Sequence, residues 1–264
     1  MAEQVVLMDE PSPGVARLLI NRPDKRNAID YDVRQALIEY LDEISGDSAV
    51  RALVCGGVGG IFSAGGDVPS MAGLNEEQAR ARMAHIHQLC LRLAALRIPV
   101  VSALEGFGAG AAVGLALLGD HIVVGPGSKV LFPFMRLGLT PDWGTLQTLP
   151  ARVGLPCARR LLTSGQVLSG EEAVSLGLAD EFAADGDIMA GALRRAELMA
   201  RLPQEAFARM KLRLNHPAGD LHSELQKEED DQACLLLGAD FREGFAAFSE
   251  LRDPDFTLTA RVEA

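Results

Sequence analysis

The sequence predicts an α/β fold in which parallel strands are joined by helical crossovers. Between residues 15 and 125, short runs of β-branched and apolar residues alternate with amphipathic segments. Two of those runs pass directly into glycine-rich segments, and the chain after Asp142 is patterned as helix almost throughout. This alternation is typical of strand–helix–strand units, whose connections are right-handed in nearly all known cases.

Five strands are expected, and most are bounded by residues that end extended structure. VARLLINRP ends in a loop marked by proline, and VRALVCGG ends in two glycines. PVVSALEG and HIVVG lie on either side of the longest glycine-rich stretch, and GLADEF follows as a last strand. The ranges are 15–23, 50–57, 99–106, 121–125 and 177–182.

Helices are expected between these strands and over most of the C-terminal third. Asp30 is placed to cap a helix over about 31–44, and a longer amphipathic helix is expected over 76–96. The glycine-rich stretch turns into a further helix. The remaining candidates are 156–163, 170–176, 187–201, 204–214, 220–237 and 240–251.

Composition and charge limit the class of protein. The 264 residues, 48% hydrophobic and 23% charged, suit one large domain or two small ones. The net charge is −11 and no block of Lys or Arg stands out, so nucleic-acid binding is not expected. This charge does not exclude an anionic ligand, because local backbone dipoles can outweigh it.

A cytoplasmic location is expected from the cysteines and from the targeting features that the sequence lacks. The cysteines form no C-x-x-C pair and are typical of reduced thiols: Cys55, Cys90, Cys157 and Cys234. No signal peptide is expected, because the N-terminus has neither a basic segment nor a long apolar run. Glu105 and several glycines interrupt the apolar stretch 99–118, which favours a buried strand and helix over a membrane span.

The stretch EGFGAGAAVGLALLGD (105–120) contains five glycines and four alanines, and three interpretations are open. It could simply allow tight packing of a strand on a helix. Gly106-x-Gly108-x-x-Ala111 also fits a loose dinucleotide-binding pattern, but no acidic residue follows about 20 residues later to hold a ribose. The third interpretation is an oxyanion hole, since a bare helix N-terminus offers unpaired N–H groups to a carbonyl oxygen.

A second glycine-rich turn, FSAGGDV (62–68), could supply the other donor of such a hole. Taken alone, it could equally be a loop in which Asp67 caps a helical turn. Both turns follow parallel strands, so they are expected at the same carboxyl edge of the sheet, where ligands bind in open α/β folds.

Six segments together resemble the crotonase superfamily, the enoyl-CoA hydratase/isomerase family, over nearly the whole chain. Their order and spacing along the chain also resemble the family. They are RPDKRNAI (22–29), FSAGGDV (62–68), PVVSALEGFGAGAAVGLALLGD (99–120), LGLTPDWG (137–144), LLTSGQVLSGEEAVSLGLADE (161–181) and FREGFAAFSELRDPDF (241–256).

The resemblance implies a crotonase/ClpP-like spiral of ββα repeats with a C-terminal helical trimerisation region. A core with the CoA-thioester site is expected over 1–190, and helices for oligomerisation and pocket closure over 191–264. Family members usually form trimers or dimers of trimers, so a homotrimer or hexamer is expected. The implied substrate is an acyl-CoA thioester, with no separate cofactor and no metal.

The resemblance also assigns residues to the site. The backbone N–H groups of Gly66 and Ala111 would hold the thioester oxygen as it becomes an enolate, and each such donor is typically worth about 3 kcal/mol of barrier. Ala64, Gly65 and Asp67 surround the first donor in the A-G-G-D motif. In the loop expected to meet CoA, the contacts would be Lys25, Arg26 and Ala28. Lys25 or Arg26 would pair with phosphates, although a merely solvated loop is the alternative.

The hydratases of this family use two glutamates, and this chain has neither. The resemblance places the first at Gly114 and the second at Phe134, and neither residue transfers a proton. Two-glutamate hydration is therefore not expected. The chain keeps one carboxylate at a suggestive place, Asp142 in PDWG, which resembles the P-D-x-G version of ring-opening and double-bond isomerases of aromatic-acid degradation.

Asp142 as acid and base suits a double-bond shift, because one carboxylate can remove a proton at C2 and return it at C4. Phe132, Phe134 and Trp143 are expected as an apolar wall that raises its basicity and excludes water. The alternative is that Asp142 merely caps the next helix.

Other charged residues are further candidates for the site. His87 falls where the dehalogenase branch of the family has an active-site histidine, but Phe134 stands where that branch has tryptophan. His85 and His87 lie about 200° apart on a helix, which argues against a shared metal. Glu105 is expected to be structural, and Arg252 is a weaker candidate for a CoA contact from a neighbouring subunit.

Three functions remain open from the sequence. The favoured one is an enoyl-CoA isomerase with Asp142 as acid and base. The second is a hydratase or lyase that uses a non-standard acid, and the third is a non-catalytic acyl-CoA-binding protein, since loss of both glutamates is also how a family member becomes a carrier.

Overall fold

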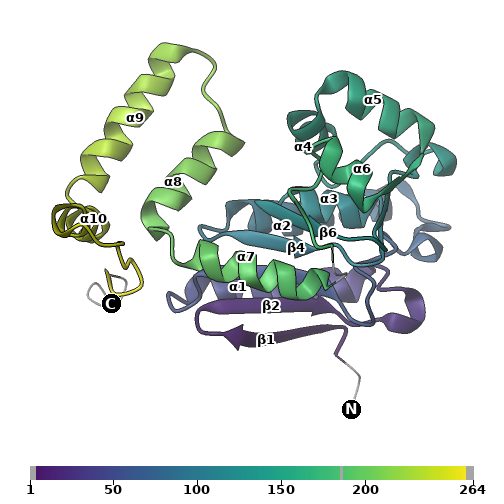
Figure 1. The fold of residues 1–264 in the computed structure, drawn as a ribbon. Coiled ribbons are helices and arrows are strands. Elements are labelled where there is room, and N and C mark those ends of the chain that lie inside the picture. Colours follow the sequence, from purple (N-terminus) through teal and green to yellow (C-terminus); the bar gives the residue numbers. More distant parts are fainter. Residues whose placement is uncertain (1–3, 185–186, 260–264) are drawn as a thin grey trace.

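The computed structural model describes residues 4–184 and 187–259. A six-stranded sheet forms its centre in the order β1-β2-β3-β4-β6-β9 (Figure 1). β1 and β2 form an antiparallel hairpin, and the other neighbours in this sheet are parallel. Its strands are β1 (Val6–Ser12), β2 (Val15–Ile20), β3 (Ala52–Gly57), β4 (Val100–Ala103), β6 (His121–Val124) and β9 (Glu181–Phe182).

A second, smaller layer of extended chain accompanies this sheet. Its three strands have the order β5-β7-β8 and comprise β5 (Phe107–Ala109), β7 (Lys129–Leu131) and β8 (Val167–Ser169). Two isolated parallel bridges, Ile29 to Gly66 and Ser63 to Gly108, extend it. Each of β2, β3, β4 and β6 is thus followed a few residues later by a segment of this second layer, which is the expected repeat of two strands and a helix.

Helices cover both faces of the large sheet. α1 (Tyr31–Gly46), α2 (Glu76–Ala95) and the short, fully buried α3 (Ala111–Leu117) contribute to the main core. α7 (Ile188–Ala200) packs on the opposite face, where Ala192 and Ala196 meet alternate residues of β3 and β4 (Figure 1). β3 is buried on both faces, which explains its continuous apolar sequence.

Capping residues begin the two long helices beside the site. Asp30 accepts a hydrogen bond from the Val33 N–H and begins α1 as expected. Asn75 and Gln78 form a reciprocal capping box at the start of α2. The remaining elements are the 3₁₀ turns η1 (Pro23–Lys25), η2 (Val68–Met71) and η3 (Phe134–Leu137) and the helices α4 (Thr145–Val153), α5 (Leu155–Ser164), α6 (Gly170–Ser175), α8 (Gln204–Asn215), α9 (Leu221–Leu235) and α10 (Ala239–Glu250).

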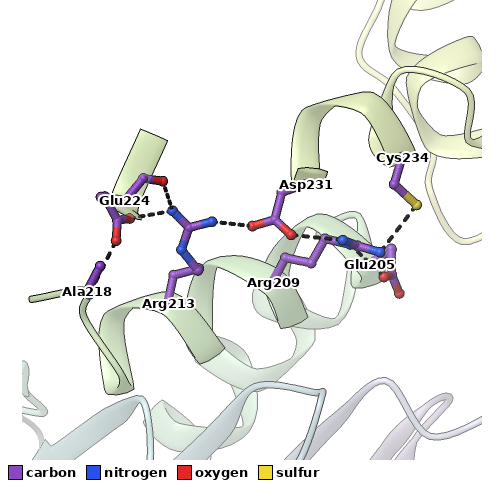
Figure 2. A network of polar contacts seen from close by, with 7 residues as sticks. All are labelled: Glu205, Arg209, Arg213, Ala218, Glu224, Asp231 and Cys234. Atoms are coloured by element: carbon purple, nitrogen blue, oxygen red, sulfur yellow. Dashed lines mark hydrogen bonds and ion pairs between the residues drawn. The ribbon is translucent and has the colours of Figure 1, made fainter. Parts of the chain in front are cut away.

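The last three helices form what we call the C-terminal arm (α8–α10), in which α9 and α10 stand away from the sheet (Figure 1), while Lys211 of α8 bonds to the Ile98 carbonyl and to Asp120 beside β4 and β6. A chain of charges ties α8 to α9: Arg209 and Arg213 both pair with Asp231, at 2.8 and 2.7 Å (Figure 2). The domain boundary expected at residue 190 falls inside α7, and this helix packs on the sheet rather than in the arm. The division into two domains remains a prediction.

Candidate active site

The first expected oxyanion donor, Gly66, lies in a loop held in extended form beside residue 29. The Ile29 N–H donates to the Gly65 carbonyl at 2.8 Å, and the Asp67 N–H donates to the Ile29 carbonyl at 3.1 Å. In a parallel bridge, one residue bonds to the two neighbours of the residue opposite it, and that opposite residue directs its own N–H the other way. Here Ile29 bonds to Gly65 and Asp67, and Gly66 is the residue between them. The N–H of Gly66 is therefore turned away from Ile29 and free for a ligand.

The second expected donor, Ala111, is the first residue of α3. Its N–H belongs to the first turn, where a helix offers no internal acceptor. Gly110 before it adopts φ +49° and donates its own N–H to Leu131 of β7 at 3.0 Å. β5 and β7 therefore fix the direction in which α3 starts.

The two donor segments lie side by side. Ser63 and Gly108 form a parallel bridge, and the Ser63 N–H donates to the Phe107 carbonyl at 3.0 Å. A Cβ built at Gly65 would lie 3.7 Å from the Ala111 nitrogen, and one built at Gly66 would lie 4.0 Å from the Ala111 Cβ. This close approach leaves no room for a side chain at Gly65 and brings both N–H groups to one small region.

A buried clamp holds the Gly66 loop, and the sequence analysis gave it no role. The Asn27 side chain is 0% exposed, donates to the carbonyls of Val58 and Ile61 at 2.9 and 2.6 Å, and accepts from the Arg22 N–H at 2.9 Å. The Ser63 hydroxyl donates to the Asn27 carbonyl at 2.7 Å and accepts from the Gly65 N–H at 3.0 Å. The available signal was an asparagine within the 22–29 loop, because Asn tolerates the left-handed conformation that Asn27 adopts, φ +57°.

Asp142 lies between η3 and α4 and is half-buried. Its Oδ1 atom is inaccessible and has no hydrogen-bond partner among the described residues. Burial raises the pKa of Asp142, a shift opposed by a hydrogen bond to its own backbone and by the charges of Arg82 and His87. The side chain does not cap α4, which starts after Gly144 without a side-chain cap, so the capping interpretation is wrong.

Trp143 fills the position that the first hydratase glutamate would need. A Cβ at Gly114 would lie 2.5 Å from the Trp143 Cβ and 3.1 Å from the Thr145 hydroxyl oxygen. Trp143 is buried and adopts φ +54°, a conformation that is unusual for a bulky side chain and common at functional sites. Gly114 is one turn after Ala111, so the PDWG segment lies over the first turn of α3.

Phe134, at the position of the second hydratase glutamate, is buried against the same turn. Its ring lies 3.6 Å from a Cβ built at Gly110, directly before the Ala111 donor. Phe132 is also buried. Apolar packing therefore occupies both glutamate positions: Trp143 lies against Gly114 at the first, and Phe134 itself stands at the second.

Arg82 is a further residue beside the site, and the sequence analysis missed it. Its Nη2 atom lies 3.7 Å from a Cβ built at Gly66, and its Nη1 atom is 3.4 Å from the Ser70 hydroxyl. The signal was its spacing on α2, since Arg82 continues the row of buried Ile86 and Cys90. His87, expected as a site member, is exposed on the same helix.

The loop expected to meet CoA is built as a platform beside the Gly66 loop. Lys25 and Arg26 are exposed, and the Arg26 carbonyl accepts the Ala64 N–H at 2.9 Å. The Ala28 carbonyl accepts from the Arg22 side chain at 2.7 Å. The phosphate-pairing roles remain predictions.

Of three further charged residues, Asp67 and Arg252 form ion pairs within the protein, and Glu105 is half-buried. Asp67 faces Arg22 at 3.6 Å and makes no cap hydrogen bond to η2. Arg252 pairs with Glu243 and Glu250, and Glu105 is half-buried, with a pKa raised by burial and by Asp187.

Neither a metal site nor a membrane span emerges from the described part of the chain. Within residues 4–184 and 187–259, His, Cys, Asp and Glu form no group of three placed to hold a metal ion. In the same ranges no helix has the length and apolar character needed to cross a bilayer.

The sequence is similar to proteins of one family along its length. The family model described as enoyl-CoA hydratase/isomerase matches residues 10–259. The chain is 31% identical to 1,2-epoxyphenylacetyl-CoA isomerase of Escherichia coli K12, over 95% of this chain and 98% of that protein. It is 34% identical to a probable enoyl-CoA hydratase of Rhodobacter capsulatus, over 94% of this chain and 96% of that one.

Solved structures give the same result for the fold. The enoyl-CoA hydratase of Bacillus anthracis superposes with a TM-score of 0.90 at 27% identity, over 96% of this chain and 99% of that one. An enoyl-CoA hydratase from Polaromonas sp. JS666 gives 0.88 at 27% identity, over 95% and 98%. The crotonase-like α/β fold with its C-terminal helical region is thereby confirmed, and the chain is an acyl-CoA-processing enzyme that belongs to the enoyl-CoA hydratase/isomerase family.

Proposed function

We propose that this protein is an enoyl-CoA isomerase, in which Asp142 moves a proton while the N–H groups of Gly66 and Ala111 hold the thioester oxygen. The observation that carries the proposal is the unpartnered, buried oxygen of Asp142, on the segment that overlies the first turn of α3. Both positions of the hydratase glutamates hold groups that transfer no proton. Asp142 is thus the carboxylate best placed to do acid–base chemistry.

The proposed reaction needs one such group. The carboxylate of Asp142 takes a proton from C2 of a 3-enoyl-CoA, and the electron pair moves onto the thioester oxygen, which the two N–H groups stabilise. The same carboxyl then returns the proton at C4, and the double bond is left between C2 and C3. No atom is gained or lost, so neither a cofactor nor a metal is required.

The surroundings of Asp142 suit a base that works without water. Burial raises its pKa, which makes its carboxylate a stronger base than an exposed aspartate. The aromatic residues Phe132, Phe134 and Trp143 are all buried, and as an apolar wall around Asp142 they would exclude the oriented water that hydration requires.

The remaining assignments complete the proposal. Lys25 and Arg26 would pair with CoA phosphates, the protein would act in the cytoplasm, and the C-terminal arm would pack against other subunits of a homotrimer or hexamer. The name of the E. coli relative favours isomerisation, and that of the R. capsulatus relative favours a hydratase with a non-standard acid. A non-catalytic acyl-CoA binder is the third possibility.

The deciding experiment compares 3-enoyl-CoA, 2-enoyl-CoA and aromatic-ring CoA substrates with no added cofactor. An isomerase converts 3-enoyl-CoA into the conjugated 2-enoyl thioester, and ultraviolet absorbance of the conjugated product rises. Hydration of 2-enoyl-CoA without isomerisation would contradict the proposal. Tight binding of the thioesters with no conversion would identify a carrier instead.

A further inference from the structure

A cavity of about 320 Å³ lies beside the Gly66 loop, and two arginines are part of its mostly apolar lining. It lies between the start of α1, the turn η2 and the N-terminal half of α2. Its walls include Tyr31, Arg34, Ser70, Leu74, Arg82 and His85. Neither Arg34 nor Arg82 has a role in the reaction proposed above.

Arg34 is the more deeply buried of the two cations. The residue is 2% exposed, and its Nη1 atom has no hydrogen-bond partner among the described residues. Its Nε atom donates to Nδ1 of His85 at 3.3 Å, and the guanidinium lies 5.9 Å from the centre of the Tyr31 ring. Burial, and then the nearby charge of Arg82, lower the pKa of Arg34 to about 10. A buried guanidinium N–H group without an acceptor costs free energy unless a ligand accepts its hydrogen bond.

The second cation, Arg82, adds a like charge to the same cavity. In the described ranges no carboxylate lies within ion-pair distance of Arg34 or Arg82. The carboxylates that influence them are Asp30, Asp67 and Asp142. Asp30 and Asp67 face Arg22, at 2.9 and 3.6 Å, and Asp142 is the proposed base. Despite these carboxylates, Arg34 and Arg82 repel each other, since the charge of Arg82 contributes to the lowered pKa of Arg34, and an anion bound between them would relieve that repulsion.

The cavity and the oxyanion region share Arg82. Its guanidinium lies 3.7 Å from a Cβ built at Gly66, whose N–H is the proposed thioester contact. An acyl group whose carbonyl oxygen is held there begins beside Arg82. A chain of a few carbons can then continue toward Arg34 past the Tyr31 and His85 rings, which stack at 4.5 Å.

We propose that this cavity receives a carboxylate at the far end of the acyl group, so that the preferred substrate is an enoyl-CoA thioester of a dicarboxylic acid. This inference rests on the proposed function, because it uses the thioester position at Gly66 and Ala111. A carboxylate fits the two guanidinium groups better than an alkyl end, since Arg binds planar carboxylates through two parallel hydrogen bonds.

The test uses two 3-enoyl-CoA substrates of equal length, one with a terminal carboxylate and one with a terminal methyl group. We expect the wild-type kcat/KM to be at least about tenfold higher for the carboxylate substrate, because charged hydrogen bonds to the arginines would stabilise its binding. Arg34→Gln should lower this preference about tenfold. Arg80→Gln is the control, because Arg80 is on α2 like Arg82 but is exposed and paired with Glu76, and the preference should survive. If Arg34→Gln fails to fold by thermal unfolding, Arg82→Gln replaces it.

The outcomes separate this inference from the proposed function. Equal turnover of both substrates would overturn the inference and leave the isomerase intact. If neither substrate reacts, calorimetric titration compares saturated carboxyacyl-CoA and acyl-CoA. Tighter binding of the former, lost in Arg34→Gln, supports the inference, and equal binding overturns it. Stabilisation by inorganic phosphate that requires Arg34, without any preference between the two thioesters, would show a free-anion site instead and would also overturn it.

Discussion

Asp142 is the residue on which the proposed chemistry depends. Replacing it by Asn keeps its size and removes its ability to take a proton, so we expect kcat to fall by about 10²–10⁴-fold. The dissociation constant for a saturated acyl-CoA should change little, because the proposed thioester contacts are backbone N–H groups. Steady-state assays and calorimetric titration check both. Asp32→Asn, an exposed change on α1, is the control, and full activity in Asp142→Asn would remove Asp142 from the mechanism.

The raised pKa of Asp142 predicts two pH effects of opposite sign. Activity needs the carboxylate, so kcat/KM should rise with pH through an apparent pKa above the usual 3.8. Stability behaves in the opposite way, because between the ordinary and the raised pKa the folded state holds a proton that the unfolded state has lost. Burying the ionised carboxylate therefore lowers the free energy of unfolding at pH values above the raised pKa. This cost disappears at pH values below the ordinary pKa.

Asp142→Asn offers a direct check of this linkage. The variant carries no charge to bury, so its melting temperature should exceed that of the wild type at neutral pH. The difference should shrink as the pH falls through the raised pKa. A gap that stays constant across acid pH would show that ionisation of Asp142 is not its cause.

At the residue scale, Gly114 shows how packing leaves no room for a side chain at the position of the first hydratase glutamate. Gly114→Ala places a Cβ 2.5 Å from that of Trp143, so we expect the free energy of unfolding to fall by about 1–3 kcal/mol through overpacking. Gly127→Ala is the control, since a Cβ there meets no atom within 4 Å. Chemical denaturation of the two variants measures the difference, and equal stabilities would contradict the packing argument.

At the scale of elements, the clamp between the 22–29 loop and the 58–67 loop positions the first donor. Asn27→Ala leaves buried backbone carbonyls without partners, and we expect a loss of about 1–3 kcal/mol of stability. kcat/KM should also fall, because the loop that carries Gly66 loses its anchor. Asn21→Ala, which removes one exposed hydrogen bond to the Gln4 carbonyl, should affect neither quantity strongly. Denaturation midpoints and kinetics on the same preparations separate the two effects.

The long elements could be predicted from sequence because their signals are local. α1, α2 and α7–α10 follow helical spacing and caps, and their observed bounds lie within about two residues of the expected ones. β5, β7 and β8 were not expected, since three residues carry no usable alternation and their pairing is set by distant segments. β1 was not expected either, because its largely exposed and polar residues show no clear strand alternation.

The candidate site likewise contains residues that the sequence could identify and residues that it could not. Gly66, Ala111 and Asp142 were found through the motifs of a resembled family, which name positions whatever their surroundings. Asn27 and Arg82 were not, because their importance comes from contacts made across the fold: carbonyls of the next loop for one, and the Gly66 turn for the other. The local sign that could have identified Arg82 is a charged residue in an otherwise apolar row of a helix.

At the scale of the whole molecule, the C-terminal arm exposes more apolar side chains than a free surface favours. They include Met210 and Leu214 of α8, Leu225 of α9 and Phe241, Phe245 and Phe248 of α10. We expect sedimentation to show a trimer or hexamer. Phe248 is 78% exposed, and Phe248→Glu should shift the protein toward smaller species. Leu91→Glu, a lone exposed leucine on α2, serves as the control, and a wild-type protein that sediments as a stable monomer would refute this assembly.

Trp143 has a practical consequence for the whole chain. It is the sole tryptophan in the sequence, it follows Asp142 directly, and it is buried against Gly114 of α3. Intrinsic fluorescence excited at the indole therefore reports from the candidate site alone. Quenching or a spectral shift on titration with thioesters would monitor occupancy in the unlabelled protein.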